Sequence, residues 1–284
     1  MQPHLEEISR EAEEVVRNIG LPPCPAILAG LVREMRNDEP DFNKLGQLIG
    51  GDVTLAAAML KTVNSPFYGL RTKVASIKQA LALLGLRTVT HLVTGLLLRQ
   101  AFPAGAGAHL EEFWERSAGN ARASACLARK LKGVDADETY TFALFRDCGI
   151  PAMMAGYRDY RPEHAVPAPG QLVTARETER YGMNHAVMGS CLAKSWLLPE
   201  AICHAVLWHH EYPALADGSA RIPAASLRLI ALGLAGEQLF ARHAMSVSCP
   251  EWGERGAYVL ENLGLEEGEF DAMLSEFGDQ LDSR

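Results

Sequence analysis

Residues 49–69 read IGGDVTLAAAMLKTVNSPFYG, and this stretch shows the helix-and-turn pattern that recurs through much of the chain. Asp52 is of a residue type that caps helix N-termini, and Leu55 and Met59 follow it at helical spacing. Asn-Ser-Pro at 64–66 then predicts the end of the helix, because proline cannot continue the backbone hydrogen-bond pattern. The residues of this stretch therefore predict one capped helix that ends in a turn.

The same helical period recurs along the chain, whereas sustained period-two alternation, which would indicate strands, does not. Ser76 and Gln79 form a capping-box pattern that predicts a helix start, and Gly85 suits the end of that helix. A further helix is expected from about residue 86 to 101. Other helices are predicted at 4–19, 27–35, 42–49, 111–132, 137–155, 171–181, 184–196 and 199–209, with three or four more within 223–284. The sequence therefore predicts an all-α fold.

Glycine and proline mark the breaks between these helical segments. Residues 103–107 read PAGAG, the clearest linker in the chain, and a boundary between two helical subdomains is predicted near 103–110. Loops are also predicted at 158–170, which is rich in proline, and at 212–220.

The overall composition excludes several classes of protein. The net charge is −8, so binding to nucleic acid is not expected, because phosphate backbones attract basic surfaces. The six cysteines are scattered without a C-x-x-C pair, which predicts buried thiols rather than disulfides or a zinc cage. Residues 80–98 are the most apolar stretch, but Arg87 and His91 interrupt it, so a core helix rather than a membrane span is expected. The first residues lack the pattern of a secretory signal, and a cytoplasmic location is expected.

Six ordered segments resemble the HDOD family, a divergent branch of the HD phosphohydrolase superfamily. They are LPPCP at 21–25, IGGD at 49–52, VNSPFYG at 63–69, the predicted helix at 77–85, Phe113-Trp114 with Ser117, and WLLP at 196–199 followed by His209-His210. Val53 departs from the family pattern, which usually has proline there. The resemblance implies an HDOD-type multi-helix domain over residues 21–215, in which an N-terminal helical subdomain packs on a degenerate HD-like helical subdomain. Residues 1–20 are then an N-terminal helix, and 216–284 a C-terminal helical extension.

The resemblance also implies where the metal ligands of an active HD enzyme would lie. Four positions keep a residue type that can bind a divalent cation: Asp147, His185, His209 and His210. Each residue also has an ordinary interpretation. Asp147 can form an ion pair with any nearby base, His185 can be a polar residue at a helix N-terminus, and the two adjacent histidines lie near a helix C-terminus, where positive charge is favourable.

Three other ligand positions of the HD pattern are lost. Arg116 and Arg146 stand where active enzymes have histidine, and residues 229–235 contain no counterpart of the late aspartate. Arginine has no lone pair to donate and stays protonated, so both are interpreted as vestigial-site arginines, and one of them is expected to replace the charge of the metal by pairing with Asp147. Adjacent helical side chains point about 100° apart. Arg116 is therefore predicted to pair with Asp147 in preference to Arg146. No catalytic residue, cofactor or metal ion is expected; the alternative is a divalent metal at the four retained positions.

These positions and the resemblance together imply a function class. The first hypothesis is a non-catalytic signal-transduction or regulatory module that binds proteins or a nucleotide, the latter held by the two arginines. Its expected partners are signalling proteins such as kinases, response regulators or cyclic-dinucleotide enzymes, without nucleic acid or membrane. The C-terminal extension is then an adaptor surface or part of the core. The alternative is a metal-dependent phosphohydrolase or phosphodiesterase with a depleted metal site.

Overall fold

The computed structural model describes residues 21–102, 108–161, 172–212, 222–244 and 249–282. Within these ranges the chain is helical and contains no strand, which confirms the predicted all-α fold. The helix predicted at 4–19, the linker at 103–107 and most of the two predicted loops lie outside the described residues.

The chain forms two compact units. The smaller unit comprises Pro22–Pro103 together with Ser195–Leu197, and the larger comprises the described parts of Ala104–Lys194 and Leu198–Arg284. The smaller unit contains α2 (Ala26–Glu34), α3 (Phe42–Gly50), α4 (Val53–Val63), the short 3-10 helix η1 (Pro66–Tyr68) and α5 (Ile77–Ala101). Helix α5 packs against α2, α3 and α4, and their apolar faces form the core of this unit.

The helix ends of the smaller unit follow the predicted capping chemistry. Asp52 accepts a hydrogen bond from a backbone N–H three residues later, and Ser76 does the same at the start of α5. The Gln79 side chain reaches back to the N–H of Ala75, one residue before the cap. Gly85 has φ +80°, which is not a helical conformation, and therefore divides α5 into two helical parts. Glycine suits this position because a residue with a β-carbon rarely adopts such a φ. The predicted helix end at Gly85 is thereby confirmed.

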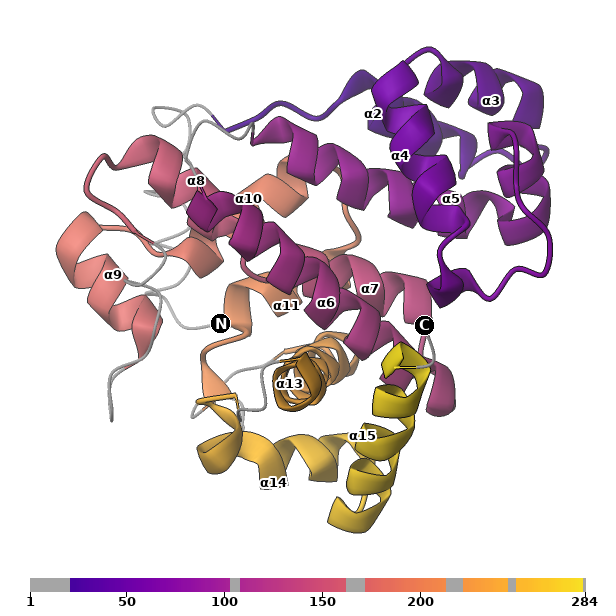
Figure 1. Cartoon of the computed structure of the whole chain (residues 1–284). Coiled ribbons are helices and arrows are strands. Elements are labelled where there is room, and N and C mark those ends of the chain that lie inside the picture. The colour runs from indigo at the N-terminus through magenta and orange to yellow at the C-terminus, as the bar shows by residue number, and fades with distance from the viewer. Residues whose placement is uncertain (1–20, 103–107, 162–171, 213–221, 245–248, 283–284) are drawn as a thin grey trace. The chain divides into compact units, whose positions relative to one another are not determined.

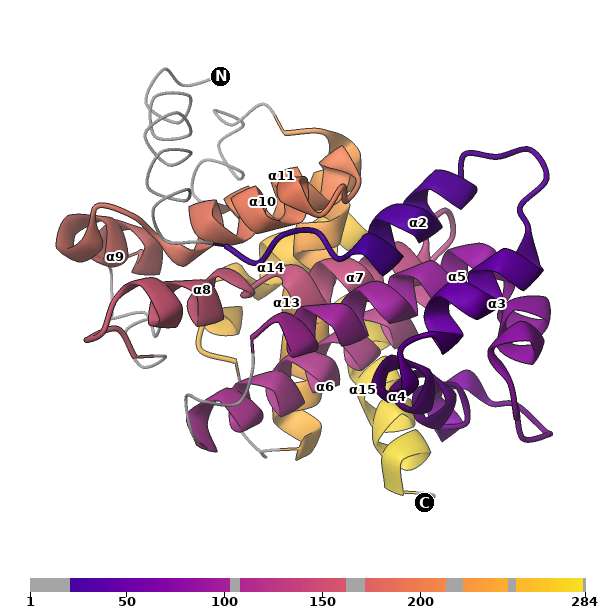
Figure 2. The same cartoon turned by 90° about the horizontal axis from the view of Figure 1, so that it is seen from above.

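The larger unit is built around one central helix, α13 (Ala224–Ala244). Helix α13 is seen nearly end-on in Figure 1 and contacts α6, α7, α11, α14 and α15. The other helices of the unit are α6 (Ala108–Lys130), α7 (Ala136–Phe145), α8 (Gly149–Gly156), α9 (Val173–Tyr181), α10 (His185–Ser195), α11 (Glu200–Trp208), α14 (Trp252–Leu263) and α15 (Glu267–Asp282), of which Figure 2 gives a second view. The helices after residue 221 are thus part of the core of this unit.

The single helix predicted at 137–155 is wrong, because the chain turns between α7 and α8. The break follows Phe145, and a hydrogen-bonded turn carries the chain into α8 at Gly149. A β-carbon at Gly149 would lie 1.9 Å from the backbone oxygen of His185, so only glycine lets α8 begin against α10. This close approach brings the turn beside the first residue of α10.

Two described helices, α5 and α13, are long and apolar enough to cross a membrane by length and composition. Core helices pass the same test, and 67% of the apolar window of α13 and 44% of that of α5 is buried inside the structure. Helix α5 is also broken by Gly85. These are properties of core helices.

Candidate metal centre

Four side chains of the larger unit converge on one point: Asp147, His185, His209 and His210. Asp147 lies in the turn between α7 and α8, His185 begins α10, and the adjacent pair follows the C-terminus of α11. One possible ligand atom from each residue lies within 4.8 Å of the others. The structure therefore brings together all four residues that the sequence singled out as candidate ligands.

The His185 ring is fixed by a buried carboxylate from α9. Glu177 Oε2 accepts a hydrogen bond from the backbone N–H of His185 at 2.9 Å and lies 2.7 Å from its ring Nδ1. The hydroxyl of Tyr160 donates to the other oxygen of Glu177 at 2.5 Å. Burial lowers the pKa of His185, but the charge and hydrogen bond of Glu177 together with the charge of Asp147 outweigh it, so the net pKa is raised. Because a carboxylate can only accept, Nδ1 carries the proton and Nε2 points into the cluster.

The other two rings are oriented in the same way. The Nδ1 of His209 lies 2.7 Å from the carbonyl oxygen of Val206, and the Nδ1 of His210 lies 2.9 Å from Glu251 Oε1. Both acceptors assign the proton to Nδ1, which leaves Nε2 as the atom that faces the cluster. Burial and the neighbouring imidazole of His210 lower the pKa of His209 to about 4, so its ring is neutral at pH 7.

Three of the separations between the converging atoms are close to those between ligands of one metal ion. The Nε2 atoms of His185 and His210 are 3.0 Å apart, and Asp147 Oδ1 lies 3.3 Å from Nε2 of His209 and 3.8 Å from that of His185. Ligands at about 2.0–2.1 Å around a tetrahedral zinc ion are separated by about 3.3 Å. The buried Nε2 of His209 has no hydrogen-bond partner. Two Nε2 atoms 3.0 Å apart also cannot both present lone pairs without a proton or cation between them.

The second oxygen of Asp147 faces a side chain that is already positive. Arg146 Nε donates to Asp147 Oδ2 at 3.2 Å, and its Nη2 donates to Glu237 Oε2 at 2.7 Å. The Arg146 side chain is only 10% exposed. Burial would raise the pKa of Asp147, but Arg146 and the imidazoles hold it well below its usual range. The carboxylate is therefore ionised and shared between the guanidinium group of Arg146 and the imidazoles of His185 and His209.

The prediction that Arg116 pairs with Asp147 in preference to Arg146 is wrong. Arg116 is exposed on α6, whereas Arg146 closes the C-terminus of α7. The 100° rule separates the directions of adjacent helical side chains, but a long guanidinium side chain at a helix end can fold back to its neighbour. Glu237 from α13 holds it in that position.

Sequence reasoning missed three carboxylates that organise the centre. Glu177 and Glu251 orient imidazoles, and Glu237 pairs with Arg146. Glu237 lies two positions beyond the stretch 229–235, where the late aspartate of active enzymes was sought. A lone carboxylate in the apolar sequence of α13 was the available signal. The other two follow no motif quoted for the family.

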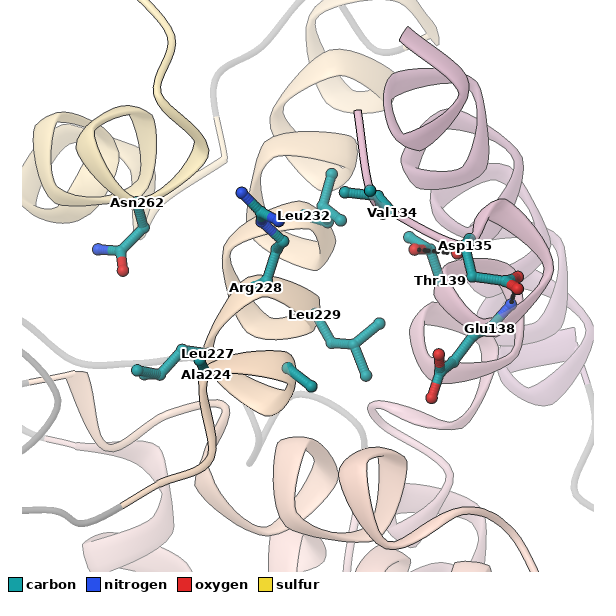
Figure 3. A pocket seen from close by; sticks show the side chains of 12 residues that line it. Val134, Asp135, Glu138, Thr139, Ala224, Leu227, Arg228, Leu229, Leu232 and Asn262 are labelled. Carbon is teal, nitrogen blue, oxygen red and sulfur yellow. Dashed lines mark hydrogen bonds between the residues drawn. The ribbon is translucent and has the colours of Figure 1, made fainter. Parts of the chain in front are cut away.

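A cavity of the larger unit lies away from these residues. It has a volume of about 480 Å³ and is lined by α7, α13 and the end of α14. Figure 3 shows Arg228 on α13 between Glu138 of α7 and Asn262 of α14. Neither vestigial-site arginine lines it, nor does any of the four candidate ligands.

Known proteins are similar to this chain in sequence and in fold. An uncharacterized protein of Treponema pallidum (strain Nichols) is 26% identical over 209 residues, which cover 68% of this chain and 38% of that protein. A solved HDOD domain protein of unknown function from Geobacter sulfurreducens has a TM-score of 0.72 at 20% identity and covers 98% of this chain and 96% of its own. At such identity the likeness concerns the fold alone.

Two further solved structures share the fold. A candidate phosphohydrolase from Shewanella amazonensis SB2B has a TM-score of 0.71 at 22% identity, covering 95% of this chain and 94% of that one. A candidate signal transduction protein from Marinobacter aquaeolei VT8 has a TM-score of 0.69 at 18% identity, covering 97% and 64%. The family model of the HDOD domain matches residues 21–212, which is more than half of the sequence, and the chain therefore belongs to the HDOD family.

Proposed function

We propose that this chain is a non-catalytic signalling module whose HD-like centre binds one divalent transition-metal ion as a structural element. One observation carries the proposal. The two oxygens of Asp147 face different partners: Oδ2 pairs with Arg146, whereas Oδ1 faces the imidazole nitrogens. This favours the metal alternative of the sequence analysis over an empty site.

The donor set supports one ion. Three imidazoles, each neutral once it binds a metal, and one carboxylate oxygen are ligands that zinc and its neighbours in the first transition row accept. Each imidazole also has an oxygen acceptor on its Nδ1, which is the arrangement that orients metal-binding histidines. A bound ion would supply a fixed positive charge that holds the ends of α7, α10 and α11 together.

Two features argue against turnover. Four protein donors complete a tetrahedral shell, whereas a catalytic zinc site keeps one position open for water or substrate. Arg146 also occupies the side of Asp147 where a second cation would bind, and it is neutralised by Asp147 and Glu237. Two-metal hydrolases need ions about 3.5–4 Å apart. A second ion beside Asp147 would have to displace the guanidinium group.

The proposed activity is regulation through binding. The chain would act in the cytoplasm on signalling proteins such as kinases, response regulators or cyclic-dinucleotide enzymes, and not on nucleic acid or membranes. The solved relative from Marinobacter aquaeolei is named as a candidate signal transduction protein, which supports this class. Nucleotide binding by both arginines is less favoured, because Arg146 is held by two carboxylates.

A metal-dependent phosphohydrolase is the second candidate function. The side chain of Asp147 is 22% exposed, so one face of the centre is open to solvent. The relative from Shewanella amazonensis is named as a candidate phosphohydrolase. This candidate requires that the bound ion expand its shell to admit a water molecule.

One experiment separates the two functions. The full chain is loaded with zinc, manganese or ferrous iron, and metal content and hydrolysis of bis(p-nitrophenyl) phosphate and cyclic dinucleotides are measured together. Asp147→Ala and His209→Ala serve as matched variants. We expect one ion per wild-type chain and loss of the ion in both variants. The wild type should hydrolyse the substrates no faster than the two variants. Metal-dependent hydrolysis that both variants abolish would establish the hydrolase, and a chain that binds no ion would remove the metal from the proposal.

A further inference from the structure

The centre is attached to a helix that lies beyond the residues matched by the family model. Glu251 immediately precedes α14, and its Oε1 lies 2.9 Å from Nδ1 of His210. Its other oxygen lies 3.0 Å from Nη1 of Arg255, one helical turn further on. We propose that Glu251 is a positioning residue that prepares His210 for the metal and thereby couples metal binding to the docking of α14. This inference rests on the proposed metal-binding function.

The first step concerns the tautomer of His210. A neutral imidazole has one N–H, and a metal can bind only the nitrogen without it. Glu251 accepts a hydrogen bond from the N–H at Nδ1, which leaves the Nε2 lone pair 3.0 Å from Nε2 of His185. Without Glu251, His210 can place its proton on Nε2 and donate it to His185 or Asp147. That tautomer removes one of the four donors from the centre.

The second step concerns what holds Glu251. Its side chain is 11% exposed, and Arg255 lies over the ring of Tyr212 at 4.3 Å from the centroid. Tyr212 follows His210 by two residues and is buried. The segment 210–212 and the first turn of α14 therefore contact each other twice, once through an imidazole and a carboxylate and once through a cation and an aromatic ring.

The third step carries this attachment further along the chain. Trp252, the first residue of α14, stacks on Phe270 of α15 with ring centroids 4.8 Å apart. The backbone N–H of Cys249 donates to the side chain of Gln238 on α13. A change in the docking of Glu251 therefore reaches α13 and α15, so these C-terminal helices respond to the state of the centre.

Thermodynamic linkage makes this coupling reciprocal. If the docked position of Glu251 strengthens metal binding by some factor, then metal binding strengthens the docking of α14 by the same factor. The proposed consequence is that the metal-bound chain presents α14 and α15 in one fixed arrangement.

Three variants of the full chain test the proposal. Glu251→Leu removes the acceptor, Glu251→Gln keeps an oxygen acceptor at the same place, and Glu254→Gln changes an exposed carboxylate of the same helix as a control. Zinc affinity is measured by competition with a chromophoric chelator. We expect Glu251→Leu to weaken zinc by about 10- to 100-fold, as removal of a partner of a ligating histidine typically does. Glu251→Gln should recover most of this loss, and Glu254→Gln should bind as the wild type.

Two further readouts distinguish positioning from general destabilisation. Nitrogen-15 spectra of metal-free wild-type protein should show the proton of His210 on Nδ1, and the Leu variant should shift it toward Nε2. Hydrogen exchange should show that zinc protects the amides of α14 in the wild type but much less in the Leu variant. Circular dichroism reports whether the Leu variant folds; if it does not, the wild-type tautomer and the Gln variant decide.

The outcomes separate this inference from the proposed function. A wild type that binds zinc while Glu251→Leu binds it equally well, with the same tautomer, overturns the role of Glu251 and leaves the metal centre intact. A wild type that binds no zinc overturns both. An Nε2–H tautomer in the wild type overturns the positioning role by itself.

Discussion

The negative charge of Asp147 is balanced differently at its two carboxylate oxygens. Oδ2 faces the guanidinium of Arg146, a cation that belongs to the chain and has a second carboxylate in Glu237. Oδ1 faces Nε2 atoms of His185 and His209, and the neutral ring of His209 adds no positive charge. The guanidinium side is complete as folded, whereas the imidazole side needs a proton or a metal. Under the proposed function, Asp147 is therefore closed by the chain's own cation on one oxygen and open to an ion on the other.

The largest expected effect is on the guanidinium side. Arg146→Met keeps most of the side-chain volume but leaves Asp147 and Glu237 as largely buried carboxylates without their cation. Removing one partner of a buried ion pair costs about 3–5 kcal/mol. We expect urea unfolding to show a loss in that range. A loss below about 1 kcal/mol, the scale of a surface ion pair, would mean that Arg146 does not balance buried charge on Asp147 and Glu237.

The imidazole side should respond to added metal instead. Zinc at 100 times its dissociation constant should raise the free energy of unfolding by about 2.7 kcal/mol, because only the folded state assembles the four donors. His209→Ala removes the buried Nε2 that has no hydrogen-bond partner, so its gain should be much smaller. Thermal unfolding with zinc and with a chelator measures both. Equal gains in the two proteins would place the ion elsewhere.

Glu237→Gln tests whether the two sides are independent. The substitution replaces a charge-assisted hydrogen bond to Arg146 by a neutral one, and we expect a loss of about 2 kcal/mol in the free energy of unfolding. Zinc affinity should stay within a factor of two of the wild type, since Arg146 still pairs with Asp147. A large change in zinc affinity would show that Glu237 acts on the imidazole side as well.

The smallest effect is expected at the other arginine of the HD pattern. Arg116 is exposed on α6, and surface substitutions away from special features usually change stability by less than about 0.5 kcal/mol. Arg116→Ala should therefore unfold at the same urea concentration as the wild type and bind zinc equally well. A loss comparable to that of Arg146→Met would restore Arg116 as a partner of the centre.

Local chemistry accounts for what could be predicted of the fold. Asp52, Ser76 and Gly85 act on backbone groups within a few residues of themselves, so their roles follow from the residues alone. The single helix expected at 137–155 failed for the opposite reason. The chain breaks there because Gly149 packs against the backbone of His185, a contact between residues far apart in the sequence.

The candidate site divides in the same way. The four converging residues were found because each matches a position of the HD pattern, and the structure places them together. The carboxylates that orient the imidazoles or pair with Arg146 were not found. Glu251 lies 41 residues from His210, and Glu237 lies 91 residues from Arg146, and no local pattern relates these pairs.

By itself, the sequence determined that the chain is helical, where most helices begin and end, and which four side chains could bind a cation. Helix periodicity and capping depend on residues that are neighbours along the chain, so they can be predicted from the sequence. Only the tertiary structure decided that Arg146 pairs with Asp147 and that α9, α13 and the residue before α14 each contribute a carboxylate. The reason is that charges buried in one place must be balanced by whichever side chains packing brings there, whatever their distance along the chain.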